Sequence, residues 1–256
     1  MRKLLGFVLL LPLFAWAQSP FDGTWKINLK NAQFAQKPDT FVLQKGEYTC
    51  STCIPKIAVK ADGADQKVPG AKGYDTLAVK QVNDKTVQYT RKKDGKAVGE
   101  STDTVSADGK TLTMEFKGYP PQGQPVTGKV ILTRVSPGPV GAHAISGSWR
   151  TEKVENVSEH GLIFTLKSTA GGFNMKTPTG ESYEAKFDGK DYPVKGDRAG
   201  GTVSLKKVND NSIEETYKQD GKPVAVNQMT VQGKTLKVVS KDVRRDTTES
   251  FTAEKQ

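Results

Sequence analysis

The sequence predicts an all-β protein made of two tandem antiparallel meander β-barrels that arose by internal duplication. The first sign is a series of short motifs that occurs twice in nearly constant register. The second is the alternation of apolar and polar residues, which is typical of strands with one buried and one wet face. The third is a turn signal roughly every 8 to 12 residues, the spacing expected of an antiparallel sandwich or barrel.

The first 17 residues predict a cleaved signal peptide rather than a membrane anchor. Arg2 and Lys3 supply the positive charge, and an apolar run follows them from Leu4 to Phe14. That run is too short to span a bilayer as a helix, which takes roughly 20 residues. Small residues then allow cleavage after Ala17. We therefore expect a mature chain that starts near Gln18 and lies in the periplasm or outside the cell, without a later transmembrane segment.

The duplication is the strongest signal in the chain. Most matched motifs are separated by an offset of 126 residues. The matched pairs include Lys60 to Asp65 with Lys186 to Asp191, Asp94 to Lys96 with Asp220 to Lys222, and the opening motifs Asp22 to Lys26 with Ser146 to Arg150. So many matches in one register indicate common descent of the two halves.

A segment rich in Pro and Gly separates the two copies. Ser136 to His143 has the composition of a connection rather than of an element. We place the boundary near residue 140, which predicts one barrel over residues 18–138 and a second over residues 144–256. Each range is long enough to bury its own core.

Alternation places the strands within each copy. Leu112, Met114 and Phe116 fall on one face of a predicted strand from Thr111 to Lys117. Asp-Gly pairs between such runs predict tight hairpins, because the turn needs positive φ angles that Gly tolerates. These pairs are Asp94-Gly95, Asp108-Gly109, Asp188-Gly189 and Asp220-Gly221. Only the segment from Asn31 to Lys37 has the pattern of a short helix.

The opening motif Phe21-Asp-Gly-Thr-Trp-Lys26 resembles the Gly-x-Trp start of lipocalins and fatty-acid-binding proteins. Closer still, the chain resembles tandem secreted lipocalin-like proteins of soil bacteria, a group without a settled function. The resemblance implies that Arg134, near the end of the first copy, either packs over the opening Trp or meets a ligand carboxylate. At the matching place the second copy has Lys255. For Trp25 and Trp149 we expect a structural role at the barrel base, with each indole N–H bonded to a carbonyl.

The two cysteines predict a disulfide. Cys50 and Cys53 are close in sequence, and an exported chain meets an oxidising compartment. Closing so small a loop stabilises by about 2 kcal/mol, so the bond rigidifies a loop rather than holding the fold. A redox centre is the alternative, but the residues after Cys53 have the pattern of a strand and not of a helix.

Charge and composition provide few candidates for chemistry. The net charge of +10 is dispersed among acidic residues, so we expect no nucleic-acid partner. His143 and His160 are the only histidines, which leaves little material for a His-based metal site or catalytic triad. The repeated Asp-Gly-x-Asp motifs could hold Ca²⁺ or act as acid and base, although ordinary turns explain them. Their carboxylates are Asp62, Asp65, Asp188 and Asp191.

Three functions stay open from the sequence. The first is an exported, non-enzymatic protein that holds a small apolar or amphipathic ligand inside a barrel. The second is a structural or interaction module of the cell envelope with filled barrels. The third is an enzyme with a carboxylate-based site. We favour the first, assign no catalytic residue, and expect no cofactor. Neither the ligand nor the oligomeric state follows from the sequence.

Overall fold

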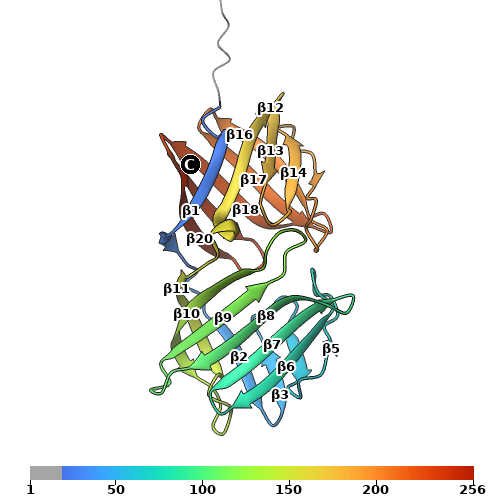
Figure 1. The fold of residues 1–256 in the computed structure, drawn as a ribbon, viewed down its shortest axis with the longest axis vertical. Helices are drawn as coiled ribbons and strands as arrows, with labels where there is room; N and C mark the ends of the chain where they lie inside the picture. Colours follow the sequence, from blue (N-terminus) through green and yellow to red (C-terminus); the bar gives the residue numbers. More distant parts are fainter. Residues whose placement is uncertain (1–18) are drawn as a thin grey trace, which may run out of the picture.

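The computed structural model describes residues 19–256, so the predicted signal peptide lies outside the described residues. The chain forms two ten-stranded antiparallel sheets, each curled into a nearly closed barrel (Figure 1). The predicted fold class, two tandem antiparallel β-barrels, is therefore confirmed. In residues 19–256 we find no α-helix and no helix long and apolar enough to cross a membrane.

We call the first sheet barrel I. It contains β2 to β11 in the order β4-β3-β2-β11-β10-β9-β8-β7-β6-β5. The strands are β2 (Asp39–Gln44), β3 (Glu47–Cys50), β4 (Ile57–Lys60), β5 (Gln66–Lys67), β6 (Thr76–Asn83), β7 (Thr86–Lys93), β8 (Lys96–Val105), β9 (Thr111–Gly118), β10 (Val126–Pro137) and β11 (Gly147–Glu155). An isolated bridge between Asp62 and Lys80 narrows the gap between the two edges of the sheet.

Barrel II contains β1 and β12 to β20 in the order β14-β13-β12-β1-β20-β19-β18-β17-β16-β15. The strands are β1 (Gly23–Gln33), β12 (Ile163–Thr169), β13 (Gly172–Lys176), β14 (Ser182–Lys186), β15 (Tyr192–Pro193), β16 (Thr202–Asn209), β17 (Ser212–Gln219), β18 (Lys222–Gln232), β19 (Thr235–Asp242) and β20 (Thr247–Lys255). A 3-10 turn, η1 (Glu159–Leu162), precedes β12.

The two copies exchange their opening strands. β1, from the first copy, lies between β20 and β12 in barrel II. β11, from the second copy, lies between β10 and β2 in barrel I. In Figure 1, β1 accordingly runs as a blue strand through the yellow and red barrel. Each barrel is thus completed by the Gly-x-Trp strand of the other copy.

This exchange corrects the predicted domain ranges. Neither residues 18–138 nor residues 144–256 contain a whole sheet. The segment from Ser136 to His143 joins β10 to β11 inside barrel I, and it does not link two domains. The chain crosses between barrels at residues 34–38 and 156–162 instead. A short connection allows β11 to pair as a hairpin with β10, which precedes it directly.

Three of the four Asp-Gly pairs join paired strands, as the sequence predicted. The fourth, Asp188-Gly189, does not form the predicted hairpin, because it connects β14 to β15, which lie at opposite edges of the barrel II sheet. Asp94 and Gly95 connect β7 to β8 with φ angles of 50° and 75°. Asp220 and Gly221 repeat this geometry between β17 and β18, at 49° and 73°. Two successive positive φ angles belong to the tight turn whose twist matches the flanking strands.

The predicted helix from Asn31 to Lys37 is wrong. β1 continues to Gln33, which lies opposite Ser250 of β20 after a bulge in the register. Residues 34–38 then carry the chain across to barrel I without regular structure. Pairing of Gln33 with β20 keeps the start of this segment extended rather than helical.

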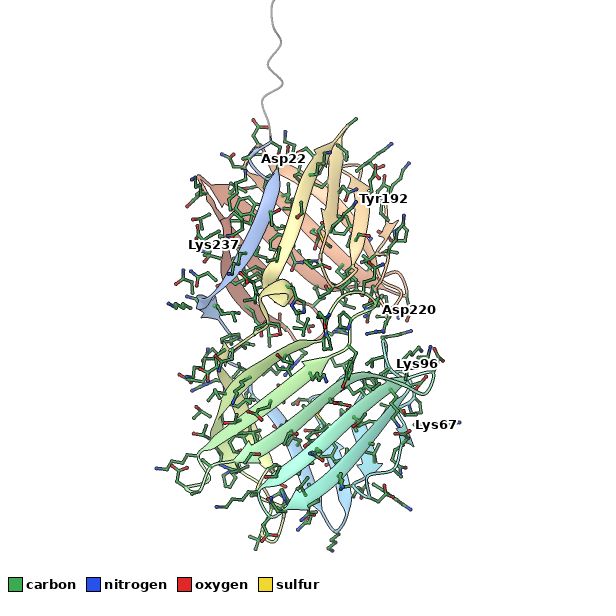
Figure 2. The ribbon with its side chains drawn as sticks, viewed as in Figure 1. Asp22, Lys67, Lys96, Tyr192, Asp220 and Lys237 are labelled. Carbon is green, nitrogen blue, oxygen red and sulfur yellow. A yellow bond between two sulfur atoms is a disulfide. The ribbon has the colours of Figure 1, made fainter. Side chains whose placement is uncertain are left out.

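The barrels face one another with their open ends. Trp25 and Trp149 close the two bases, and each lies in its own buried core cluster. Figure 2 shows Asp22 at the far end of barrel II and Asp220 close to the junction between the barrels. Asp220 forms an ion pair with Lys72 of barrel I at 2.8 Å. The interior spaces of the two barrels therefore open toward the same junction.

Candidate ligand-binding site

Each barrel is closed at its base by an opening tryptophan. Trp149 is fully buried in barrel I, and its indole N–H donates to the carbonyl of Ile145 at 2.7 Å. Trp25 is fully buried in barrel II and donates to the carbonyl of Phe21 at 2.8 Å. A buried indole needs such a partner. Both tryptophans lie at a base, but each serves the barrel of the other copy.

Arg134 also lies at the base of barrel I. Its guanidinium carbon is 3.9 Å from the centroid of the Trp149 ring. Its nitrogens donate to three backbone carbonyls, at distances of 2.5 to 2.6 Å, in the β8–β9 turn and in the loop before β11. Lys255 has the corresponding place over Trp25, at 5.3 Å. Arg134 thus packs over tryptophan, and its donors are used at the closed end.

A cavity of about 340 Å³ lies within barrel I on the open side of this base. Strands β2, β3, β7, β8, β9 and β10 contribute its walls. The apolar part of the lining comes from Phe41, Tyr48, Tyr89, Met114 and Leu132. The volume and the aromatic lining fall within the range of small-molecule sites.

Two buried polar atoms in this wall have no hydrogen-bond partner among the described residues. They are the hydroxyl oxygen of Tyr89 and one carboxylate oxygen of Asp103. The residues are only 5% and 3% exposed, so bulk water does not compensate them. Buried polar groups are nearly always paired, and those that are not call for an explanation. No other buried side-chain nitrogen or oxygen in residues 19–256 lacks a partner.

Burial also changes the acidity of Asp103. Removal from water raises the pKa of this carboxyl to about 7, although the nearby charge of Arg91 and the neighbouring Ser101 hydroxyl act in the opposite direction. Burial likewise raises the pKa of Tyr48 and Tyr89, so both phenols stay neutral. The two rings contact each other edge to face, with centroids 5.4 Å apart. The wall therefore combines aromatic surface with one carboxyl that titrates near neutrality.

Barrel II supplies part of the rim of this cavity. The turn between β19 and β20 contributes Asp242, Arg244 and Arg245. Arg245 forms an ion pair with Asp39 of β2 at 2.5 Å, and Lys37 donates to the carbonyl of Arg245 at 3.2 Å. The rim is thus held across the junction by contacts with the crossing segment and its continuation into β2.

The predicted disulfide is present and lies at the same rim. Cys50 and Cys53 are bonded, and both line the cavity of barrel I. Cys50 ends β3, and the loop it closes returns to β2, where the backbone N–H of Thr40 donates to the side-chain hydroxyl of Thr52 at 3.0 Å. The bond therefore fixes one wall of the opening.

Barrel II has a cavity of about 360 Å³ with different polar groups. Three carboxylates line it, and the one on β17, Glu215, accepts hydrogen bonds from the Tyr183 hydroxyl and, at 2.9 Å, from the Asn227 amide. The Tyr217 hydroxyl donates a hydrogen bond to the carboxylate of Asp197. These groups satisfy one another, in contrast to those of barrel I.

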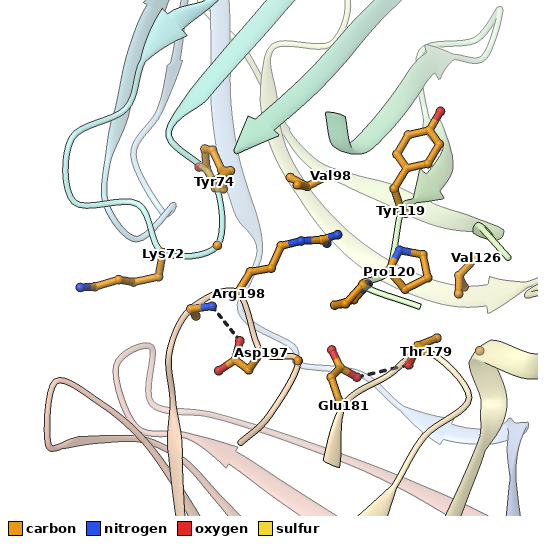
Figure 3. A pocket seen from close by; sticks show the side chains of 16 residues that line it. Lys72, Tyr74, Val98, Tyr119, Pro120, Val126, Thr179, Glu181, Asp197 and Arg198 are labelled. Carbon is orange, nitrogen blue, oxygen red and sulfur yellow. Dashed lines mark hydrogen bonds between the residues drawn. The ribbon is translucent and has the colours of Figure 1, made fainter. Parts of the chain in front are cut away.

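A groove of about 490 Å³ runs between the barrels (Figure 3). Figure 3 shows Lys72 and Tyr74 of barrel I on one side and Asp197 and Glu181 of barrel II on the other. The acidic side chains are already engaged, since Asp197 accepts from the backbone of Ala199 at 2.8 Å and Glu181 from Thr179 at 3.3 Å. The groove is shallow, and its lining mixes these polar groups with apolar side chains such as Val98, Pro120 and Val126.

The four carboxylates of the Asp-Gly-x-Asp motifs take part in turns and ion pairs. Asp62 accepts from the backbone N–H of Ala64 at 2.9 Å, and Asp188 accepts from that of Lys190 at 3.0 Å. The second carboxylate of each motif is paired with lysine: Asp65 with Lys92 at 2.8 Å and Asp191 with Lys218 at 2.6 Å. Among residues 19–256, no group of three or more His, Cys, Asp or Glu is arranged to hold a metal ion.

The histidines are also placed apart from the cavity. His143 lies in the loop before β11, where its Nε2 is 2.6 Å from the carbonyl oxygen of Asn83. His160 lies in η1, and its Nε2 is 3.0 Å from the carbonyl oxygen of Gln124. Each thus joins two segments of backbone, in different parts of the molecule.

Sequence reasoning missed the polar residues on which the proposed site depends, namely Tyr48, Tyr89, Arg91 and Asp103. A signal for them existed: Asp103 shares its strand face with Val105, so the alternation puts a carboxylate on the buried side. The duplication supplied a second signal, because the offset of 126 residues aligns Asp103 with the apolar Met229. A charged residue that replaces an apolar one on the inner face is an unusual substitution.

Comparisons with protein-family models, with curated proteins and with solved structures find no match to this chain.

Proposed function

We propose that this protein is an exported, non-enzymatic binding protein that holds a small amphipathic molecule in the cavity of barrel I. The observation that carries the proposal is the pair of unpartnered buried atoms, Tyr89 Oη and Asp103 Oδ1, in the wall of a cavity of about 340 Å³. Aromatic side chains around them supply apolar surface for the body of the ligand. The lipocalin-like opening motif agrees with this use of a barrel interior.

The energetics favour an occupied cavity. A buried polar group without a partner costs about 1–3 kcal/mol, more if it is charged. A ligand that bonds to Tyr89 and Asp103 removes this cost, and its apolar part gains about 25 cal/mol for each Å² taken out of water. A ligand in barrel II would gain nothing from unpartnered polar groups, because the buried groups there already form hydrogen bonds with one another. Barrel I is therefore the binding unit, and barrel II completes its rim.

Native mass spectrometry of mature protein isolated from its own source tests the proposal. We expect discrete added masses that disappear after extraction with organic solvent. The stripped protein should then enhance the fluorescence of 1-anilinonaphthalene-8-sulfonate. A clean mass for the isolated protein, together with no response to this probe, contradicts the proposed function.

Two matched variants locate the site. Met114→Trp fills the cavity of barrel I, and Ala225→Trp fills that of barrel II; both residues line their cavities and are partly buried. We expect Met114→Trp to reduce probe binding at least tenfold and Ala225→Trp to leave it within twofold. The reverse pattern places the ligand in barrel II and overturns our assignment.

A further inference from the structure

The charged residues of the barrel I cavity fall into two groups. At the rim, Arg245 is paired with Asp39 at 2.5 Å and Arg244 with Asp242 at 3.7 Å. Inside, neither Arg91 nor Asp103 belongs to any ion pair within residues 19–256. The cavity thus retains one cation and one anion that face the same space and do not neutralise each other directly.

The strand register separates these two charges along the barrel. Asp103 of β8 lies opposite Val87 of β7, whereas Arg91 lies opposite Gly99. Four residues of strand separate the two levels, which is about 13 Å of backbone. Asp103 is the deeper group, because the next inward residue after it, Val105, pairs with Leu112 near the Trp149 base. Gly99 carries no side chain, so it leaves room beside Arg91 toward the opening.

Asp103 is buried and Arg91 is half-buried, so each carries a cost, because it loses hydration without gaining a direct ion-pair partner. A molecule that lies between them and carries the complementary charges removes both costs. Its cationic group would donate to the unpartnered oxygen of Asp103. Its anionic group would accept from the guanidinium of Arg91, whose planar pair of donors matches a carboxylate. Tyr48, Tyr89 and Met114 would contact the apolar remainder.

On this basis, and resting on the proposed function, we infer that the ligand of barrel I is a small zwitterion with an apolar or aromatic body, of the amino-acid type. Its ammonium group lies between Asp103 and the Tyr89 hydroxyl, and its carboxylate points outward to Arg91. The body fills the aromatic part of the cavity. This assignment adds a charge pattern to the amphipathic ligand proposed above and excludes simple fatty acids as the preferred class.

Isothermal titration calorimetry with three probes of the same body tests the inference on the full mature protein after solvent extraction. L-Phenylalanine carries both charges, 2-phenylethylamine only the cation, and 3-phenylpropionate only the anion. We expect L-phenylalanine to bind at least tenfold more tightly than either of the others. Tighter binding of 3-phenylpropionate or of 2-phenylethylamine, or binding of none of the three, overturns the inference.

Substitutions assign the two ends. Asp103→Asn should weaken L-phenylalanine and 2-phenylethylamine at least tenfold and 3-phenylpropionate little. Arg91→Gln should weaken L-phenylalanine and 3-phenylpropionate and spare 2-phenylethylamine. Glu215→Gln is the matched control, a carboxylate-to-amide change in the cavity of barrel II, and should leave all three affinities within twofold. Equal effects of Asp103→Asn on all three probes contradict the inference.

Thermal unfolding of each variant checks that it is folded before titration. The result also separates the two proposals. If 1-anilinonaphthalene-8-sulfonate still binds to barrel I while L-phenylalanine does not, the protein binds ligands of another class. The proposed function then stands, and only the inference of a zwitterionic ligand is wrong. If neither binds, the proposed function fails as well.

Discussion

Arg134 of the first copy packs over Trp149 of the second, with the guanidinium carbon 3.9 Å from the ring centroid. The opening Trp of its own copy, Trp25, lies instead in barrel II beneath Lys255. This pairing is the side-chain counterpart of the strand exchange between β1 and β11. The two barrels are therefore joined by two crossings of the chain, and neither can be removed as an intact domain by a single cut.

Engineered disulfides test the exchange. Thr40 lies opposite Ser148, with their hydroxyl oxygens 2.8 Å apart, so the double variant Thr40→Cys with Ser148→Cys should oxidise readily. Thr24→Cys with Thr165→Cys should do the same in barrel II, where the oxygens are 3.1 Å apart. Mass spectrometry of non-reduced peptides detects each engineered bond and distinguishes it from the native bond between Cys50 and Cys53.

The matched control is Thr24→Cys with Thr40→Cys. Thr24 of β1 corresponds to Ser148 of β11, so this pair would be adjacent only if the first copy closed on itself. We expect no crosslink within the monomer. Formation of this bond in place of the other two contradicts the exchanged topology.

The glycine of the opening motif is required by its backbone and its surroundings. Gly147 has a φ of 134°, and a Cβ added there would lie 2.4 Å from the carbonyl oxygen of Ser136. We predict that Gly147→Ala lowers the free energy of unfolding by about 3 kcal/mol, since it combines backbone strain with a clash against main chain. Gly46→Ala is the control, because its φ is 75° and nothing lies within 4 Å; it should cost about 1 kcal/mol. Urea unfolding measures both, and equal losses would argue against the clash.

The raised pKa of Asp103 makes stability depend on pH. Its folded value of about 7 exceeds the unfolded value of 3.8, so the folded state binds the proton more tightly between these limits. The carboxyl therefore contributes a destabilisation that is absent below pH 3.8 and grows until the pH passes about 7, where it reaches at most about 4 kcal/mol.

Asp103→Asn removes this term. We predict that the variant is more stable than the wild type at pH 8 and that the advantage shrinks steadily toward pH 5. Chemical unfolding of both proteins across this range gives the difference, in which the other carboxyls cancel. A stability difference that does not vary with pH shows that Asp103 is ionised throughout and contradicts the prediction.

The disulfide closes a small loop and should contribute modestly. Replacing Cys50 and Cys53 by serine should cost about 2 kcal/mol, or a fall in Tm of roughly 4–8 °C for a chain of this size. The barrel should still form, because the bond closes the short loop that follows β3 and does not join separate parts of the sheet. Scanning calorimetry measures the change, and loss of cooperative unfolding would show that the bond holds the fold itself.

The elements of the fold could be predicted from sequence, but their partners could not. Alternation and Asp-Gly turns predicted the hairpin strands, for example β9, which begins at Thr111 as expected. Both copies open with the same Gly-x-Trp pattern, so either opening strand fits either barrel. Which one enters depends on the connections, and the pattern of side chains does not contain that information. The helix predicted from Asn31 to Lys37 failed for a related reason, since β20 pairs with the end of β1.

The candidate site was less predictable than the fold. Asp103 and Arg91 lie on different strands, and only the register brings them into one cavity. Arg244 and Arg245 reach the rim from barrel II, and no local sequence pattern predicts this contact between barrels. The sequence instead pointed to Arg134 as a candidate ligand contact. Its guanidinium donates to three backbone carbonyls at the base of barrel I, away from the cavity.

Methyl NMR of protein labelled at its methionines tests most directly whether barrel I is the binding unit. Met114 lines the cavity of barrel I, Met175 lines that of barrel II, and Met229 is buried in the core of barrel II. On titration of the stripped protein with 1-anilinonaphthalene-8-sulfonate, we predict that the Met114 methyl shifts progressively while the Met175 and Met229 methyls stay in place. A shift of Met175 alone, or binding of the probe without any change at Met114, would contradict the assignment of the ligand to barrel I.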